Sequence, residues 1–169
     1  GAWRPVFEPA SAEVYAEVAD GGETEVLEAV EAAEAAFPSW AALAPSARAR
    51  WLERLADALE ARLALFAAAE SRDAGKPLAL ARDIEIPRAV ANLRFFAHAA
   101  TQFASESPHG QAGLNYTPRA PLGVVAAISP WNLPPHLFTR MTHPVLASGQ
   151  PVRAKAASLT PAPAPLPAT

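Results

Sequence analysis

Residues 121–159 constrain the fold of this chain more than any other stretch. Residues 124–128 form an apolar run with the length and branching of a buried parallel strand, and the run stops at Ser129 and Pro130. Apolar residues then recur at helical spacing until Gly149, and a second short strand is expected at residues 152–154. The pattern predicts a βαβ unit, a module that commonly holds a nucleotide at the carboxyl ends of its parallel strands.

Two polar residues follow the ends of the two expected strands. Asn132 stands at the expected N-cap of the helix, ahead of Pro134 in its first turn, and Lys155 follows the second strand. Because the carboxyl ends of adjacent parallel strands meet at one edge, we expect Asn132 and Lys155 on the same side of the unit. An amide at this turn can cap the helix or donate to an oxygen that gains negative charge, and both roles stay open.

The first part of the chain predicts a strand pair followed by helices. Short strands are expected around residues 5–7 and 13–18, and an amphipathic helix over residues 23–37, ended by Pro38. Residues 45–75 favour one long helix or two helices in tandem, capped at the glycine.

The middle of the chain predicts one more helix and then irregular structure. The helix starts near Pro77, is interrupted or restarted at Pro87, and runs to about residue 103. A loop at 105–110 and a strand at 114–119 follow, and the proline- and alanine-rich residues 161–169 favour extended polyproline conformations.

Composition excludes several classes of function. The chain has 169 residues, 51% of them hydrophobic, but much of this fraction is alanine, so the core should be thin. It contains no cysteine, which rules out disulfides and a cysteine nucleophile within these residues. The cations beyond Glu106 are too dispersed to follow a nucleic acid. Without an apolar run near the ~20 residues of a membrane span, we expect a soluble, cytoplasmic protein with no membrane or nucleic-acid partner.

No metal site is expected either. His136 and His143 could share a helix face, but two histidines without a nearby carboxylate or cysteine make a poor metal site. A serine triad is excluded because no G-x-S-x-G elbow occurs and no acid follows Glu106.

Several short segments in register resemble one known family. They are FEPASAEV, FPSWAALAPSARARWL, AGKPL, PRAVANLRFFA, LNYTPRAPLG and PLGVVAAISPWNLP, with an Ala-Lys pair after the next strand. Together they resemble the NAD(P)-dependent aldehyde dehydrogenase superfamily, leaning to the members that act on muconic semialdehydes or betaine aldehyde. The resemblance implies an incomplete α/β fold, with an amino-terminal helical region and the start of a parallel, Rossmann-like sheet. It divides the chain into residues 1–112 packing on the cofactor domain, an arm strand at 113–120, a βαβ unit at 121–160 and a tail at 161–169.

The resemblance also implies roles for individual residues. Asn132 would be the oxyanion-stabilising asparagine, and Lys155 would donate to the adenosine ribose of NAD or NADP. Ser158 occupies the position of a ribose-binding glutamate in many NAD-using members, so its small neutral side chain favours tolerance of NADP. The turn that passes the nicotinamide end of the cofactor would be lined by Ile128, Ser129, Pro130 and Trp131.

The implied reaction is oxidation of a small-molecule aldehyde to a carboxylic acid. The chain would be a fragment that lacks the catalytic cysteine and is inactive alone, while the full-length form would be a homo-oligomer paired through the arm. The alternative is a non-catalytic truncated paralogue or decayed gene product that acts at most by pairing with a full-length subunit. Pro151 at a strand entry and Arg153 at an aliphatic position of the family favour this alternative, since an unpaired buried charge is costly.

Overall fold

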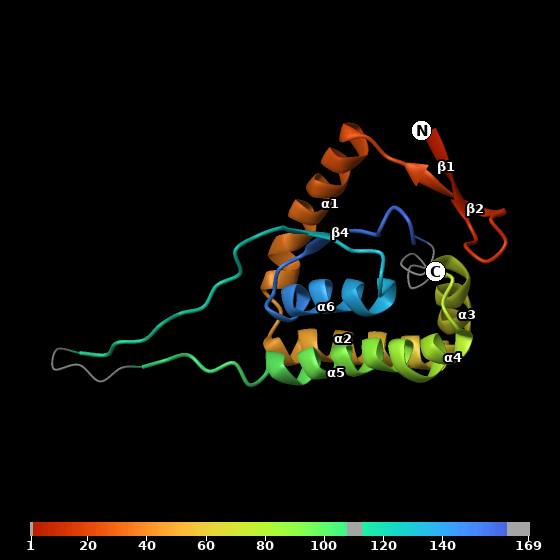
Figure 1. Cartoon of the computed structure of the whole chain (residues 1–169). Coiled ribbons are helices and arrows are strands. Elements are labelled where there is room, and N and C mark those ends of the chain that lie inside the picture. The colour runs from red at the N-terminus through yellow and green to blue at the C-terminus, as the bar shows by residue number, and fades with distance from the viewer. Residues whose placement is uncertain (1, 108–112, 162–169) are drawn as a thin grey trace.

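A computed structural model describes residues 2–107 and 113–161 of the chain. The elements are β1 (Ala2–Phe7), β2 (Val14–Asp20), α1 (Glu23–Ala41), α2 (Pro45–Ala61), α3 (Leu63–Ala74), α4 (Leu78–Leu80), the π-helical turn η1 (Ala81–Glu85), α5 (Ile86–Ala100), β3 (Val125–Ile128), α6 (Pro134–Ala147) and β4 (Val152–Lys155). Figure 1 shows an amino-terminal hairpin, helices α2 and α5 side by side beneath α6, and a small sheet between α6 and α1. The mixed helix and strand architecture with a short parallel sheet confirms the predicted fold class.

The strands β1 and β2 form the expected antiparallel hairpin, which docks on the end of α3. The Tyr15 hydroxyl donates a hydrogen bond to Asp73, and the Arg72 guanidinium lies 4.5 Å from the centre of the Tyr15 ring. Arg72 also pairs with Glu8 at 3.2 Å. The hairpin is therefore tied to the helical part by polar and cation–π contacts more than by a shared apolar core.

The helices follow the predicted pattern with two corrections, and one alternative that the sequence left open is resolved. The expected end of the first helix at Pro38 is wrong, because α1 continues to Ala41 and the Pro38 carbonyl accepts the Ala42 N–H at 3.1 Å. The 45–75 segment is two helices in tandem, broken at Arg62, and Gly75 ends α3 with a left-handed φ of 69°. The last helix of this region, α5, ends at Ala100 rather than near residue 103.

The apolar core lies where α2, α3, η1, α5 and α6 meet, and it is built largely from small side chains. Leu52, Ile86 and Leu93 are its largest fully buried apolar side chains. The other members are Ala56, Leu59, Phe66, Ala67, Ala81, Ala89, Val90, Ala97 and Ala147. The many alanines contribute little apolar area each, so the core is thin, as the composition predicts.

The strands β3 and β4 pair in parallel, in a register that runs from Val125 opposite Val152 to Ile128 opposite Lys155. This confirms the predicted βαβ unit, with α6 as its crossover helix. The predicted N-cap is wrong, because Leu133 occupies the N-cap of α6 and no side chain caps this end. Pro134 at the first helical position has no N–H to satisfy, so the helix start needs one donor fewer.

The segment between α5 and β3 projects from the helices as an arm, defined here as residues 101–107 and 113–120 (Figure 1). The expected strand at 114–119 forms no ladder within the described part of this chain, so its pairing with a neighbouring subunit stays a prediction. The two sides of the arm touch where the Thr117 N–H donates to the Glu106 carbonyl at 2.9 Å. The end of the expected loop and most of the expected tail, residues 108–110 and 162–169, lie outside the described residues.

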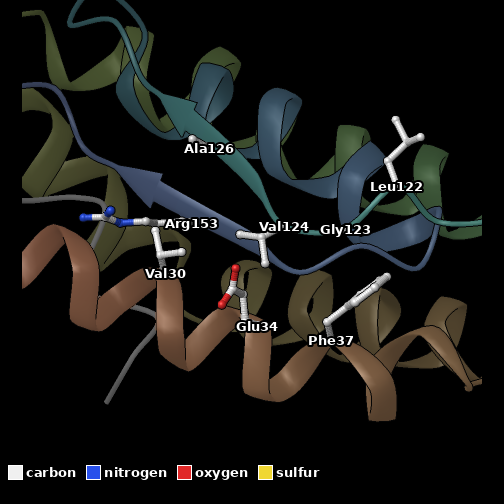
Figure 2. Close-up of a pocket in the computed structure, with 8 residues that line it drawn as sticks. All are labelled: Val30, Glu34, Phe37, Leu122, Gly123, Val124, Ala126 and Arg153. Atoms are coloured by element: carbon white, nitrogen blue, oxygen red, sulfur yellow. The ribbon is translucent and has the colours of Figure 1, made fainter.

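The face of the sheet toward α1 is hollowed by a cavity of about 470 Å³. Figure 2 shows Val30, Glu34 and Phe37 of α1 on one side of it and Arg153 of β4 on the other. The expectation of a fully buried charge at Arg153 is wrong, because its side chain is only half-buried and lines this cavity. Pro151 is buried but precedes β4, where its carbonyl accepts the Val125 N–H at 3.1 Å.

Candidate functional site

The candidate site lies at the carboxyl edge of the β3–β4 sheet. Ile128 and Lys155 are paired in the ladder, and the Ser129 N–H donates to the Lys155 carbonyl at 2.9 Å, so the two strands end level with each other. Asn132 follows one strand end and Lys155 closes the other. The expectation that both residues follow the same edge of the unit is confirmed.

The turn between β3 and α6 combines a fixed backbone with exposed side chains. Ser129 is buried, and the Thr160 hydroxyl donates to the Trp131 carbonyl at 3.2 Å, which ties the turn to the segment after β4. The Ile128 and Trp131 side chains are nevertheless 71% and 59% exposed, and Pro130 and Asn132 are exposed as well. The edge thus presents an open apolar surface with an amide beside it.

Lys155 and Ser158 come together beyond β4. The Lys155 ammonium donates to the Ser158 hydroxyl at 2.9 Å and to the Ala156 carbonyl at 3.1 Å. Both side chains are exposed, so the third N–H of the ammonium is open to solvent or to a ligand hydroxyl. The Ser158 hydroxyl could accept and donate next to it, which makes this pair suitable for binding a diol.

Sequence reasoning did not single out a buried ion network below the turn. Lys76 donates to Glu70 and Glu85, each at 2.6 Å, and to the backbone carbonyl of Asn132 at 3.3 Å. A signal was present, because Glu70 falls at helical spacing from Phe66 and Ala67 on the apolar face of α3. An acid at a core position requires a buried partner, and Lys76 is the nearby cation.

Positive charge gathers around His136 in the first turn of α6. Burial lowers the pKa of His136 below 6.5, and the charges of Arg88 on α5 and Arg140 on α6 lower it further. His136 is therefore neutral at physiological pH, while both arginines are exposed and charged. Within residues 2–107 and 113–161 no group of three metal-ligating side chains is found.

The position of these side chains agrees with a general rule for open α/β sheets. Such sheets bind their ligands outside the carboxyl ends of the parallel strands, which is where Asn132 follows β3 and Lys155 ends β4. None of the helices in the described part of the chain is sufficiently long and apolar to cross a bilayer.

Comparison with known proteins gives the family. Residues 2–168 match the aldehyde dehydrogenase family, and the chain belongs to it. It is 47% identical over 156 residues to the 2-aminomuconic semialdehyde dehydrogenase of Bos taurus. The matched segment covers 91% of this chain and 32% of the relative. It is 43% identical over 159 residues to the 2-hydroxymuconic semialdehyde dehydrogenase of Pseudomonas sp. (strain CF600). That match covers 90% of this chain and 33% of the relative. The chain thus spans about a third of the length of the curated relatives it matches.

Solved structures agree with this assignment. A putative aldehyde dehydrogenase from Burkholderia cenocepacia matches with a TM-score of 0.96 and 36% identity, over 99% of this chain and 34% of that one. A structure of PnpE in complex with nicotinamide adenine dinucleotide matches with a TM-score of 0.96 and 34% identity. The match covers 99% of this chain and 35% of the PnpE chain. The described fold is therefore the corresponding third of an aldehyde dehydrogenase chain.

Proposed function

We propose that this chain forms part of the active site of an NAD(P)-dependent aldehyde dehydrogenase, which oxidises an aldehyde to a carboxylic acid. The observation that carries the proposal is the carboxyl edge of the sheet, where Asn132 and Lys155 follow adjacent strand ends. Membership of the aldehyde dehydrogenase family supports it. Because the chain contains no cysteine, a thiolate that attacks the aldehyde comes from residues outside this sequence.

The residues at this edge fit NAD or NADP. Lys155 and Ser158 offer an ammonium and a hydroxyl 2.9 Å apart to the ribose hydroxyls, and Ser158 brings no negative charge that would repel a 2′-phosphate. The exposed apolar surface of Ile128 and Trp131, with Ser129 and Pro130, would lie along the nicotinamide end. The bound cofactor supplies the hydride acceptor for the oxidation.

Asn132 would act on the aldehyde oxygen. Its amide NH₂ donates a hydrogen bond that strengthens as negative charge grows on that oxygen, and one such donor lowers a barrier by about 3 kcal/mol. The amide carries no charge itself, so it needs no proton transfer to do so. The carbonyl of the same residue is held by Lys76 at 3.3 Å, on the side of the helical part.

The cations around His136 favour an acidic aldehyde over betaine aldehyde as substrate. Arg88 and Arg140 are close enough to His136 to lower its pKa, and His136 follows Asn132 by four residues. A muconic-type semialdehyde carries a carboxylate that guanidinium groups can bind, whereas betaine aldehyde is a cation that they repel. The 2-aminomuconic and 2-hydroxymuconic semialdehyde dehydrogenases that this chain resembles are named for the same class of semialdehyde acids.

A chimera tests the proposal, with this chain in place of the matching third of a curated 2-aminomuconic semialdehyde dehydrogenase. We expect cofactor reduction by the chimera and a loss of about 100-fold or more in kcat on Asn132→Ala. The matched control is Gln150→Ala, which removes an amide from the turn before β4, at the opposite end of the strand from the site, and should leave kcat unchanged. The purified chain alone should give no turnover with either cofactor. An inactive chimera, or one in which Asn132→Ala has no effect, would contradict the proposal.

A second candidate function is supported by the arm. Phe103, Leu114 and Tyr116 are exposed on a segment that projects away from the helices, where a neighbouring chain could cover them. The chain would then act without catalysis, by pairing with a full-length subunit. Co-expression with a full-length relative distinguishes the two functions, because only this second one requires mixed oligomers to form.

A further inference from the structure

The Lys76 network joins three elements at one buried point. Lys76 lies between α3 and α4, Glu70 belongs to α3 and Glu85 to η1, and all three side chains are nearly inaccessible to solvent. The Lys76 ammonium is 2.6 Å from an oxygen of each carboxylate. Its third contact is the Asn132 carbonyl at 3.3 Å, which belongs to a segment 56 residues further along the chain.

The number of donors makes this contact specific. An ammonium has three N–H groups, and Lys76 has three acceptors within hydrogen-bonding distance. Two of them are carboxylates that fix the ammonium position, so the third N–H is directed at the Asn132 carbonyl. That carbonyl lies in the peptide plane joining Asn132 to Leu133. Fixing this plane restricts ψ of Asn132, which together with φ sets the direction in which its side chain leaves the backbone.

The turn has few other restraints at this point. The N-cap Leu133 supplies no side-chain hydrogen bond to α6, and the Asn132 side chain is exposed. Backbone contacts hold Ser129 and Trp131, but among the described residues Lys76 is the side chain that donates to Asn132 itself.

We propose that Lys76 is a positioning residue for Asn132, held in place by Glu70 and Glu85. It fixes the backbone of the turn so that the amide aims at the aldehyde oxygen, and it touches neither aldehyde nor cofactor. The catalytic consequence rests on the proposed function, whereas the effect on the turn does not. A misplacement of about 1 Å at a reacting group can cost on the order of 100-fold in rate, so a residue that acts only on the backbone has a measurable effect.

The charge of the network gives a readout that distinguishes positioning from helix packing. Burial, and then the neighbouring Glu85, raise the pKa of Glu70 to about 7 in spite of Lys76. The charged groups that face Glu70 are Lys76 and Glu85, and beyond Glu85 lies His136 of α6, whose pKa is lowered below 6.5. Protonation of Glu70 should therefore change the conformation of the turn with a midpoint near pH 7, which is higher than the pKa of His136.

Backbone NMR of this chain tests the proposal directly. The amide signals of Trp131, Asn132 and Leu133 should shift with a midpoint near pH 7, and Glu70→Gln should abolish that shift. Lys76→Met should displace the same signals, and Lys76→Arg should restore them in part. The matched control is Arg82→Met, which removes an exposed cation paired with Asp83 and should leave the turn signals in place.

A second variant keeps the test decisive if Lys76→Met unfolds. The pair Glu70→Gln and Lys76→Met leaves less uncompensated charge buried, so the helices should stay folded while the turn loses its donor. Turn signals that match the wild type in this folded variant would overturn the proposal.

The chimera separates the catalytic consequence from the proposed function. With Asn132 active, Lys76→Met should lower kcat by about 10-fold or more with little change in KM, because substrate binding is untouched. An unchanged kcat would overturn the catalytic part of the proposal. If Asn132→Ala has no effect while the turn signals still depend on Lys76, the proposed function fails and the positioning of the turn stands.

Discussion

His143 of α6 is a buried base with a strong effect on acid stability. It is 3% exposed, and burial lowers its pKa from 6.5 to about 3. Between these two values the unfolded chain binds a proton that the folded chain does not, so stability falls as the pH drops from 6.5 toward 3. We expect His143→Leu to reduce the stability lost between pH 7.5 and pH 5 by about 2 kcal/mol, measured by urea unfolding at both values.

The control for this prediction is the neighbouring Thr142→Val. Thr142 is equally buried and donates its hydroxyl to the Phe138 carbonyl, but it does not titrate. The substitution should change stability by a similar amount at both pH values. An acid sensitivity that persists in His143→Leu would mean that another group is responsible for it.

At the residue scale, the sequence predicted where single residues lie better than it predicted which side chains they contact. Asn132 and Lys155 could be placed at one edge, because strand length and breakers define where parallel strands end. The Lys76 network could not be predicted, since Glu70, Glu85 and Asn132 meet only after α3, η1 and the β3–α6 turn have packed. The roles of Asn132, Lys155 and Ser158 stay predictions.

At the scale of elements, the end of α3 controls the docking of the hairpin. Gly75 has a φ of 69°, and a Cβ built on it would lie 2.8 Å from the Cβ of Pro9 in the β1–β2 loop. Gly75→Ala therefore meets both backbone strain and a clash. We expect a loss of about 1–2 kcal/mol from the backbone and a further loss from displacement of the hairpin, measured by urea unfolding.

A double-mutant cycle with Pro9→Gly separates the two contributions. Removing the Pro9 side chain relieves the clash but leaves the strain at Gly75, so the double variant should recover part of the stability. Strict additivity of the two substitutions would show that the hairpin does not contact Gly75.

The sequence predicted the elements that pack or pair within this chain better than the stretch that has no pairing partner in it. The helices of the core and the strands β3 and β4 carry periodic apolar patterns that reflect packing within this chain. The stretch at 114–119 has the composition of a strand, but no other strand lies beside it in the described structure. Strand composition alone does not create a ladder, because each strand needs a partner for its N–H and carbonyl groups.

At the scale of the whole molecule we expect association that increases with concentration. The β3–β4 sheet has two strands with open edges, and the arm exposes Leu114 and Tyr116. Leu114→Ser with Tyr116→Ser should weaken association in sedimentation velocity, because less apolar area is covered. The matched control is Leu65→Ser, which removes an exposed leucine from α3, away from the arm.

Two results would contradict this view of the molecule. One is an arm variant that associates as strongly as the wild type. The other is a monomer with a sharp cooperative melt well above ~65 °C, since a thin, alanine-rich core should be only marginally stable.

The guanidinium of Arg48 links α2 to the end of α6, two helices that are synthesised far apart in time. Arg48 is buried on α2, where it donates to the Leu43 carbonyl and, at 3.0 Å, to the Ala147 carbonyl at the end of α6, 99 residues later. Trp40 makes a similar bond to the Leu146 carbonyl. A ribosome adds about 5–20 residues per second, so Arg48 leaves it on the order of 5–20 s before its partner. Until then this donor has no partner on α6, so we expect α2 to reach its final packing only once α6 is present.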